Sequence, residues 1–328
     1  MVDARLRGLL LAAVLVVAGC GQGATPSAGR GVDPIAAPQP LGVRDPAPQA
    51  SAAASGPAAD ACDRRASLRP GGSLPAPRRM PSGSTMEGIF RGGRLIVGID
   101  QDAYLFSYRD QDGRLVGFEI DIARRIAAAI FGDPDAVQFR AISTAERVPV
   151  LERGDVHMVI RTMTMTCERW QQVAFSTEYL SSGQRLLVRA GSGINGLADL
   201  GGRKICATNG SSSIPNIQRA ASRPIAVATD LLVDCLVLLQ QGQVDAISSI
   251  DTLLATLAAQ DPNTTIVGDR ITDDPAGIAM PRDDADLVRF VNAVLDEMRA
   301  DGSWRTSYRR WFGGVGPVPQ PPAARYRD

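Results

Sequence analysis

One segment of the sequence contains residue types suited to binding a small anion. In Arg161-Thr-Met-Thr-Met-Thr-Cys-Glu-Arg169, period-two alternation places Thr162 and Thr164 on one face of a strand. Arg169 then falls in the first turn of an expected helix, where the helix dipole disfavours a cation by up to about 1 kcal/mol. A bound carboxylate would offset that cost, because charge-assisted hydrogen bonds contribute about 1.5 to 3 kcal/mol each. The alternative is a surface arginine paired with Glu168 or with solvent.

A second arginine, Arg147, also lies near an expected helix start. Pro149 follows two residues later, and proline is tolerated only in the first turn of a helix, where no N–H is needed. Ser143 or Thr144 could cap this helix, and Glu146 would complete a capping box with Ser143. The alternative for Arg147 is a capped turn that faces solvent.

The second half of the chain offers a polar loop and a carboxylate. Thr208-Asn-Gly-Ser-Ser-Ser213 follows a strand and precedes a helix that opens near Pro215. Free N–H groups and hydroxyls converge there, which suits an anion, although an ordinary capped loop has the same pattern. Asp251 opens an apolar helix over residues 252–259, either as its N-cap or as a carboxylate that faces an ammonium group.

Alternating strands and helices must position these residues. Apolar β-branched runs predict strands at 94–99, 136–142, 156–162, 186–189 and 203–207. Apolar spacing of about 3.6 residues from Ile120 to Ile130 predicts an amphipathic helix that ends at Gly132. Such alternation implies an α/β fold with mostly parallel sheets, here read as two lobes with a ligand cleft between them.

Composition limits the function. The chain has 328 residues, with 35 basic and 35 acidic residues and one histidine, His157. This balance does not favour nucleic-acid binding, and a lone histidine excludes a metal enzyme that uses several. We expect no metal, no cofactor and a monomer. Eleven prolines between residues 26 and 81 and four between 317 and 322 predict extended tails around a folded middle.

The N-terminus resembles a bacterial lipoprotein signal. Arg5 and Arg7 precede the apolar run 9–17, and small residues stand directly before Cys20. That resemblance implies cleavage before Cys20, lipid on this cysteine and retention on the outer face of the cytoplasmic membrane. A transmembrane anchor is the alternative, but an apolar run this short spans only about half a bilayer.

Four further cysteines predict two disulfides in an exported chain. Three pairings are possible. We favour Cys206 with Cys235, 29 residues apart in one region, which leaves Cys62 to pair with Cys167 and to pin the N-terminal arm to the core. Free buried thiols are the alternative, and no pair has zinc-ligand spacing.

Taken in order, these segments closely resemble the polar amino acid-binding proteins that serve ABC importers, solute-binding protein family 3. The resemblance covers about residues 94–312, and its most specific segments are 117–121, 147–151, 162–169, 175–179 and 301–311. The cysteine positions and the proline-rich tail are most similar to actinobacterial glutamine/glutamate-binding lipoproteins.

The resemblance implies a periplasmic-binding-protein type II fold, an α/β architecture of two lobes joined by a two-stranded hinge near 183–187 and 277–281. The expected organisation is a signal peptide (1–19), a tether and N-terminal arm (20–90), lobe 1 (91–185 plus 279–312), lobe 2 (186–278) and a C-terminal tail (313–328).

The resemblance also assigns roles to residues. Arg169 matches the arginine that grips the α-carboxylate, helped by Thr164 and by Ser211 and Ser212 of the other lobe. Thr162 matches a residue whose carbonyl contacts the α-amino group.

Thr144 and Arg147 match the pair that meets the side-chain carboxylate in glutamate/aspartate binders, so an acidic ligand is expected. Phe106, with Tyr104 or Tyr108, would pack over the methylenes of the ligand. The full predicted ligand-binding set is Asp100, Phe106, Thr144, Arg147, Thr162, Thr164, Arg169, Thr208, Ser211, Ser212 and Asp251.

Three positions depart from the family pattern. The aspartate that commonly faces the ammonium is Ile250 here, next to Asp251. Either Asp251 replaces it, or carbonyls and hydroxyls alone hold the ammonium. Leu105 replaces a usual proline, and Leu232 stands where relatives often have Trp or His, which predicts a roomier pocket.

The expected function is capture of glutamate or aspartate, with asparagine or glutamine as further candidates, for delivery to an ABC permease. One alternative is a sensor that reports ligand state to a membrane signalling partner. A remote alternative is an enzyme on the same fold, such as a cyclohexadienyl dehydratase, but one histidine offers no nucleophile and base pair, so we expect no catalysis. Gly191 to Gly196 matches a dinucleotide pattern but lacks the acidic residue about 20 positions later.

Overall fold

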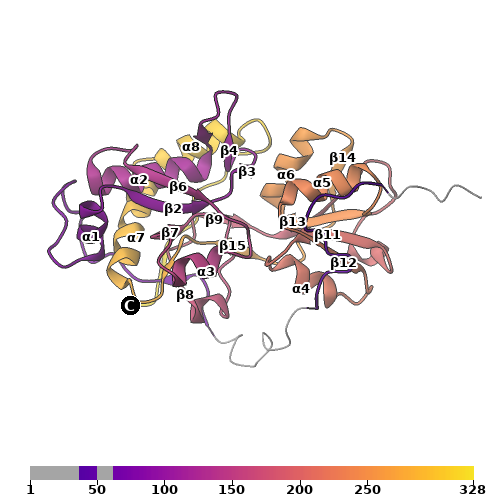
Figure 1. Ribbon diagram of the computed structural model, residues 1–328, viewed down its shortest axis with the longest axis horizontal. Helices are drawn as coiled ribbons and strands as arrows, with labels where there is room; N and C mark the ends of the chain where they lie inside the picture. Colours follow the sequence, from indigo (N-terminus) through magenta and orange to yellow (C-terminus); the bar gives the residue numbers. More distant parts are fainter. Residues whose placement is uncertain (1–36, 50–61) are drawn as a thin grey trace, which may run out of the picture. The chain divides into compact units, whose positions relative to one another are not determined.

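The computed structural model describes residues 37–49 and 62–328. The predicted signal peptide and Cys20 lie outside the described residues. Residues 85–312 form two α/β lobes joined by a short pair of strands (Figure 1). The predicted two-lobed α/β fold with a two-stranded hinge is therefore confirmed.

Lobe 1 is built on a five-stranded sheet of order β6-β2-β7-β16-β8. Its strands are β2 (Leu95–Ile99), β6 (Val137–Ala141), β7 (Met158–Val159), β8 (Val173–Phe175) and β16 (Ala279–Pro281). A small three-stranded sheet adds β3 (Asp102–Ala103), β4 (Ser107–Arg109) and β5 (Leu115–Val116). The helices are α1 (Thr85–Arg91), α2 (Phe118–Phe131), α3 (Arg147–Glu152), α7 (Ala285–Ala300) and α8 (Ser303–Phe312).

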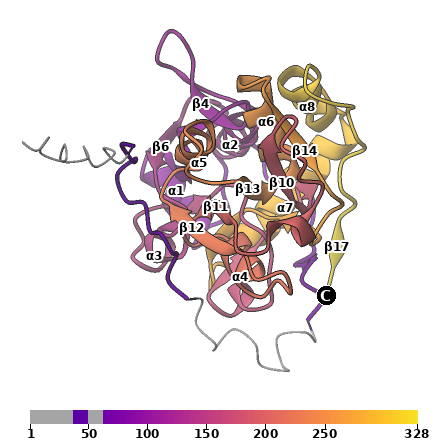
Figure 2. The same ribbon diagram turned by 90° about the vertical axis from the view of Figure 1, so that its right-hand side faces the viewer.

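Lobe 2 repeats this plan with a second five-stranded sheet, of order β12-β11-β13-β10-β14 (Figure 2). Its strands are β10 (Gln184–Arg189), β11 (Lys204–Thr208), β12 (Ile225–Thr229), β13 (Ala246–Ile250) and β14 (Thr264–Val267). Its helices are α4 (Ser213–Gln218), α5 (Leu232–Gln240) and α6 (Asp251–Gln260). Both sheets are mixed rather than mostly parallel, because β10 and β16 each run antiparallel to both of their neighbours.

The hinge consists of β9 (Leu180–Ser182) and β15 (Asp274–Ala276), paired antiparallel. The hinge was expected near 183–187 and 277–281. Each strand ends directly before its expected segment, because Gly183 and Gly277 follow the two strands and do not begin them. At Gly183 a Cβ would lie 2.3 Å from the Thr272 carbonyl oxygen, so only glycine allows this close approach.

The amphipathic helix predicted to end at Gly132 is α2, and its apolar side packs into the core of lobe 1. Ile120, Ile122, Ile126 and Ile130 are all fully buried. Aromatic rings of α8 pack on Phe118 at the start of α2, with ring centroids 5.6 to 5.7 Å apart. This packing fixes the end of α2 that lies beneath the cleft.

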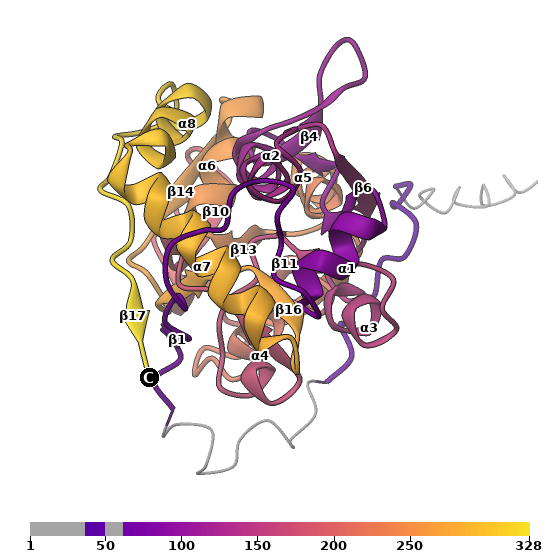
Figure 3. The ribbon, with the colours of Figure 1, turned by 90° about the vertical axis from the view of Figure 1, so that its left-hand side faces the viewer.

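Both tails pack on the lobes. Arg44 exchanges two backbone hydrogen bonds with Ala228 of β12, so the arm covers an edge strand of lobe 2. Further along the arm, β1 (Ala66–Ser67) pairs in parallel with β17 (Arg325–Tyr326) of the C-terminal tail (Figure 3). No helix within the described ranges has the length and apolar character needed to cross a membrane.

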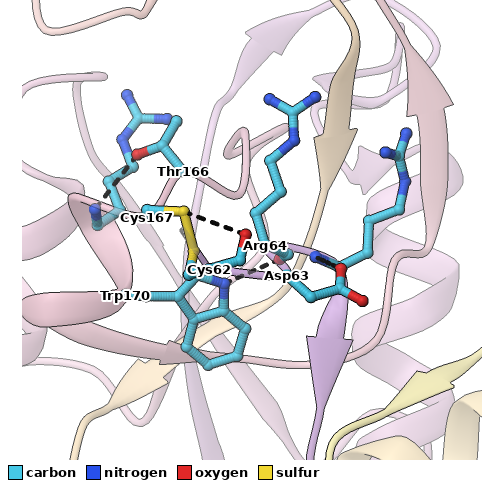
Figure 4. The surroundings of a disulfide bond; sticks show 8 residues. Cys62, Asp63, Arg64, Thr166, Cys167 and Trp170 are labelled. Atoms are coloured by element: carbon cyan, nitrogen blue, oxygen red, sulfur yellow. Dashed lines mark hydrogen bonds between the residues drawn. A yellow bond between two sulfur atoms is a disulfide. The ribbon is translucent and has the colours of Figure 1, made fainter. Parts of the chain in front are cut away.

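Two disulfides hold the structure, in the predicted pairing. Cys62 bonds Cys167 with their Cα atoms 5.9 Å apart, and Trp170 Nε1 donates to the Arg64 carbonyl oxygen at 2.8 Å beside it (Figure 4). The arm is thereby fixed to the loop that precedes Arg169. Cys206 of β11 bonds Cys235 of α5, and this bond is fully buried in lobe 2.

The Cys206–Cys235 disulfide is expected to stabilise lobe 2 substantially. It closes a loop with a sequence separation of 29. Constraint of the unfolded chain by a loop of this length is worth about 3 to 4 kcal/mol. The double variant Cys206→Ala/Cys235→Ala should lower the free energy of unfolding by about that amount in guanidinium chloride denaturation. An unchanged denaturation midpoint would contradict this expectation.

Candidate functional site

A cavity lies between the two lobes, and residues of both lobes line it. Lobe 1 contributes Asp100, Asp102, Tyr104, Thr144, Arg147, Arg161, Thr162, Thr164 and Arg169, and lobe 2 contributes Thr208, Ser211, Ser212, Leu232, Ser249 and Ile250. All predicted ligand-binding residues except Phe106 and Asp251 line this cavity. The structure thus gathers polar groups from distant parts of the chain around one space.

Arg169 is the first residue of a single 3-10 turn, Arg169–Gln171, rather than of an α-helix. Its Nη1 donates to the Thr164 carbonyl oxygen at 2.8 Å, and its Nη2 donates to the Gly210 carbonyl oxygen at 3.3 Å. Burial lowers the pKa of Arg169, and Glu168 and Asp274 oppose that shift. Within the described residues, no carboxylate forms an ion pair with Arg169, so its charge is available to an anion in the cavity.

Arg147 begins α3 and is 5% exposed. Its Nε donates to the Thr144 carbonyl oxygen at 2.9 Å, and its Nη2 donates across the cleft to the Gly210 carbonyl oxygen at 3.1 Å. Burial lowers the pKa of Arg147, and Arg169 and Arg161 lower it further. Two guanidinium groups therefore face one carbonyl oxygen, and neither has a carboxylate partner in the described part of the chain.

Local geometry explains how Arg147 and Gly210 take these positions. The expected capping box is half formed, because Glu146 accepts a hydrogen bond from the Ser143 N–H at 2.7 Å while no hydroxyl caps the helix. Gly210 has φ +75°, and a Cβ there would lie 2.8 Å from the Cα of Ala145. Glycine is therefore required where the loop of lobe 2 approaches lobe 1.

Thr162 adopts φ +42°, an unusual value for a β-branched residue. Its N–H donates to Glu119 Oε1 at 2.7 Å and to the Tyr179 hydroxyl at 3.1 Å. Its carbonyl oxygen accepts no hydrogen bond from the described residues. This carbonyl is thus available to a donor such as an ammonium group.

Glu119 supports Thr162 from beneath the cavity. It is 1% exposed and accepts from the Tyr179 hydroxyl at 2.5 Å. Burial raises the pKa of the Glu119 carboxyl above its ordinary value of 4.5, and the hydrogen bonds from Tyr179 and Thr162 oppose the shift. The folded protein therefore holds the Glu119 proton more tightly than the unfolded chain does.

This difference predicts the pH dependence of stability. Stabilisation by the Glu119 proton is complete below pH 4.5 and is lost as the pH rises through the raised pKa. The side chain in Glu119→Gln stays neutral at every pH. As the pH rises through that window, the free energy of unfolding of the wild type should therefore fall relative to that of the variant by up to about 1.4 kcal/mol per pH unit. Urea denaturation of both proteins from pH 4 to 8 measures this, with the exposed Glu152→Gln as control. A difference that is constant with pH would contradict the expectation.

Arg161 lines the cavity but was not in the predicted set. Simple alternation places it opposite Thr162 and Thr164, on the core side of the strand. The left-handed φ of Thr162 interrupts that alternation, and Arg161 reaches the cavity with 4% exposure. Its Nη2 forms an ion pair with Asp100 Oδ2 at 2.6 Å. The sequence does not predict the positive φ of Thr162, so it could not place Arg161 in the cavity.

Lobe 2 presents hydroxyls to the cavity. Ser212 Oγ lies 3.4 Å from Thr164 Oγ1 across the cleft, and the buried Ser211 Oγ has no hydrogen-bond partner among the residues described. Ser212 is the N-cap of α4 by position, yet its side chain makes no capping hydrogen bond. The loop therefore differs from an ordinary capped turn, because its hydroxyls are left for the cavity.

Phe106 does not line the cavity. Its side chain is fully buried in the core of lobe 1, with its ring centroid 4.7 Å from that of Phe312. Leu105 before it has φ +67°, and this turn directs Phe106 into the core. Tyr104 lines the cavity instead, and its ring packs edge-on against Tyr108.

Asp251 is also directed elsewhere. It forms an ion pair with Arg270 Nε at 2.6 Å, and Ile250 occupies the N-cap position of α6. Asp251 is therefore not the N-cap residue, and it does not line the cavity. Ile250 and Leu232 line the cavity as apolar groups. Nowhere in ranges 37–49 and 62–328 do three His, Cys, Asp or Glu side chains gather as metal ligands.

Comparison with known proteins adds a family. Residues 95–314 match the bacterial extracellular solute-binding proteins, family 3. A glutamine-binding protein of an ABC transporter from Bacillus subtilis is 34% identical over 230 residues, which cover 70% of this chain and 84% of that protein. A glutamate/aspartate import solute-binding protein from Salmonella typhimurium is 26% identical over 251 residues, covering 73% of this chain and 82% of that protein.

Solved structures agree with this family. An ancestral arginine-binding protein bound to glutamine is 32% identical, with a TM-score of 0.62. The alignment covers 67% of this chain and 98% of that structure. The fold described above is therefore the fold of known solute receptors.

Proposed function

Because the chain belongs to the bacterial extracellular solute-binding proteins, family 3, we propose that it captures an acidic amino acid, glutamate or aspartate, and delivers it to an ABC importer. One observation carries the choice of ligand. Arg147 and Arg169 both line the cavity, and neither forms an ion pair with a carboxylate of the described residues. A ligand with two carboxylates would supply one partner to each arginine.

In this proposal Arg169 holds the α-carboxylate. Its guanidinium donates to the Thr164 carbonyl oxygen, and the Thr164 hydroxyl lies 3.4 Å from Ser212 Oγ of the other lobe. Ser211 lines the same cavity. A carboxylate there accepts hydrogen bonds from both lobes at once. The ligand therefore favours the closed arrangement by its differential affinity for it.

The α-amino group is assigned to the Thr162 carbonyl oxygen and the Thr164 hydroxyl. This set uses neutral acceptors because position 250 is isoleucine and Asp251 is paired with Arg270. Ion pairing therefore contributes less at the ammonium than at the two carboxylates. We expect a dissociation constant near the micromolar range, about −8 kcal/mol.

The side-chain carboxylate is assigned to Arg147 and Thr144, with Tyr104 over the methylenes in place of Phe106. The names of two relatives, a glutamine-binding protein and a glutamate/aspartate import protein, support an amino acid of this length. Lipid on Cys20 would hold the receptor at the outer face of the membrane, near its permease. We propose that it acts as a monomeric receptor and not as an enzyme.

Isothermal titration of the chain without residues 1–20 tests this function. The panel is glutamate, aspartate, asparagine, glutamine and arginine, after bound ligand has been removed. Binding of glutamate or aspartate near the micromolar range, about −8 kcal/mol, is the expected result. If arginine bound tightly and neither dicarboxylate did, the two-arginine interpretation would be overturned.

A further inference from the structure

We propose that Arg161 is a positioning residue that makes the side-chain end of the cavity select a carboxylate over a carboxamide. The inference rests on the proposed function and concerns aspartate against asparagine, and glutamate against glutamine. Arg161 acts through Thr144 and Asp100, which it contacts directly.

The Arg161 guanidinium is fixed on three sides. Its Nη1 donates to Thr144 Oγ1, and its Nε donates to the Ile142 carbonyl oxygen at 2.9 Å. Its Nη2 forms an ion pair with Asp100 Oδ2 at 2.6 Å. With 4% exposure and three protein acceptors, this side chain has one well-defined orientation.

Arg161 sets the direction of hydrogen bonding at Thr144. A guanidinium only donates, so Thr144 Oγ1 must be the acceptor in their hydrogen bond. The Thr144 hydroxyl proton remains, and the described residues offer it no acceptor. Because Thr144 lines the cavity and is 6% exposed, that proton is left to donate to a ligand atom.

Arg161 also occupies the nearby carboxylate. Asp100 Oδ2 accepts from Arg161, and Asp100 Oδ1 accepts from the Asp102 N–H at 2.9 Å. Asp100 therefore offers less negative charge and less acceptor capacity to the cavity. Without Arg161, this carboxylate would repel a ligand carboxylate and would accept from a carboxamide NH₂ group.

The side-chain end of the cavity is consequently lined by donors, Arg147 and the Thr144 hydroxyl. A carboxylate presents only acceptors to them, whereas a carboxamide presents an NH₂ group to one donor and leaves it unsatisfied. An unsatisfied buried donor is penalised more than a merely weakened hydrogen bond. The arrangement therefore discriminates between ligands of nearly identical shape.

The test is the ratio of dissociation constants for asparagine and aspartate, measured by titration calorimetry. Thr144→Val removes the hydroxyl at nearly constant shape, whereas Thr144→Ser keeps a hydroxyl at this position. The double variant Arg161→Gln/Asp100→Asn offers an amide oxygen as acceptor to the hydroxyl proton of Thr144. It also removes the carboxylate that forms an ion pair with Arg161 in the wild type. Thr265→Val, at an exposed position in β14, is the matched control.

We expect Thr144→Val and the double variant each to lower the ratio about fivefold to tenfold, while Thr144→Ser keeps it within about twofold. Loss of folding would weaken both ligands alike and leave the ratio unmoved. A wild-type ratio in a folded Thr144→Val protein, or in the folded double variant, would overturn this inference. Failure of the wild type to bind aspartate would instead overturn the proposed function, so the two failures are distinguishable.

Discussion

Arg169→Ala is expected to lower the affinity for glutamate and aspartate by about 100-fold or more. Arg169 is assigned to the carboxylate that every α-amino acid carries, so asparagine and glutamine should lose affinity to a similar extent. Its paired N–H groups have only the Thr164 and Gly210 carbonyl oxygens as partners in the described chain. Removing it leaves the α-carboxylate with neutral donors alone.

Titration calorimetry of Arg169→Ala, Arg169→Lys and Arg282→Ala measures this effect. Arg169→Lys keeps the charge but loses the paired donor geometry, so an intermediate affinity is expected. Arg282 is a suitable control because it also donates to a backbone carbonyl, that of Gln171, at 2.7 Å on an exposed surface. Affinity within threefold of the wild type in Arg169→Ala would show that the α-carboxylate binds elsewhere.

Arg147→Met is expected to weaken glutamate and aspartate by about 30-fold to 100-fold and to spare asparagine comparatively. Arg147 is 5% exposed and donates to three carbonyl oxygens, so its buried charge is the main attraction for a second carboxylate. Methionine fills similar volume without burying a charge. Selective loss for the dicarboxylates therefore separates this subsite from that of Arg169.

Stability must be measured beside affinity for Arg147→Met. Removing a buried cation that has no carboxylate partner also removes a desolvation cost, so the variant should stay folded. Urea denaturation establishes whether it does. Unchanged glutamate affinity in a folded Arg147→Met protein would contradict the assignment of the side-chain carboxylate.

The parts of the fold that depend on local patterns could be predicted from the sequence. Apolar spacing in α2, the strand at Leu95–Ile99 and the cysteine pairing all agree with the structure. Thr162, Thr164 and Arg169 line the cavity as expected, but the local structure around them differs, because the strand expected over 156–162 is only Met158–Val159 and Arg169 begins a 3-10 turn. Local patterns need no knowledge of how distant segments meet.

The features that depend on backbone angles and on distant partners could not be predicted in this way. Positive φ values at Thr162 and Leu105 bring Arg161 to the cavity and take Phe106 away from it. Asp251 turns to Arg270, which is 19 residues later and gives no local signal. Arg44 of the arm pairs with Ala228 of β12, and these two residues are far apart in the sequence.

The most direct test of the central claim is a crystal structure of the receptor with glutamate or aspartate bound. We expect the α-carboxylate within hydrogen-bond distance of the Arg169 guanidinium and the α-amino group at the Thr162 carbonyl oxygen. The side-chain carboxylate should lie at Arg147 and Thr144. A ligand that lay in the reverse orientation, or that left Arg147 without a carboxylate partner, would contradict the claim.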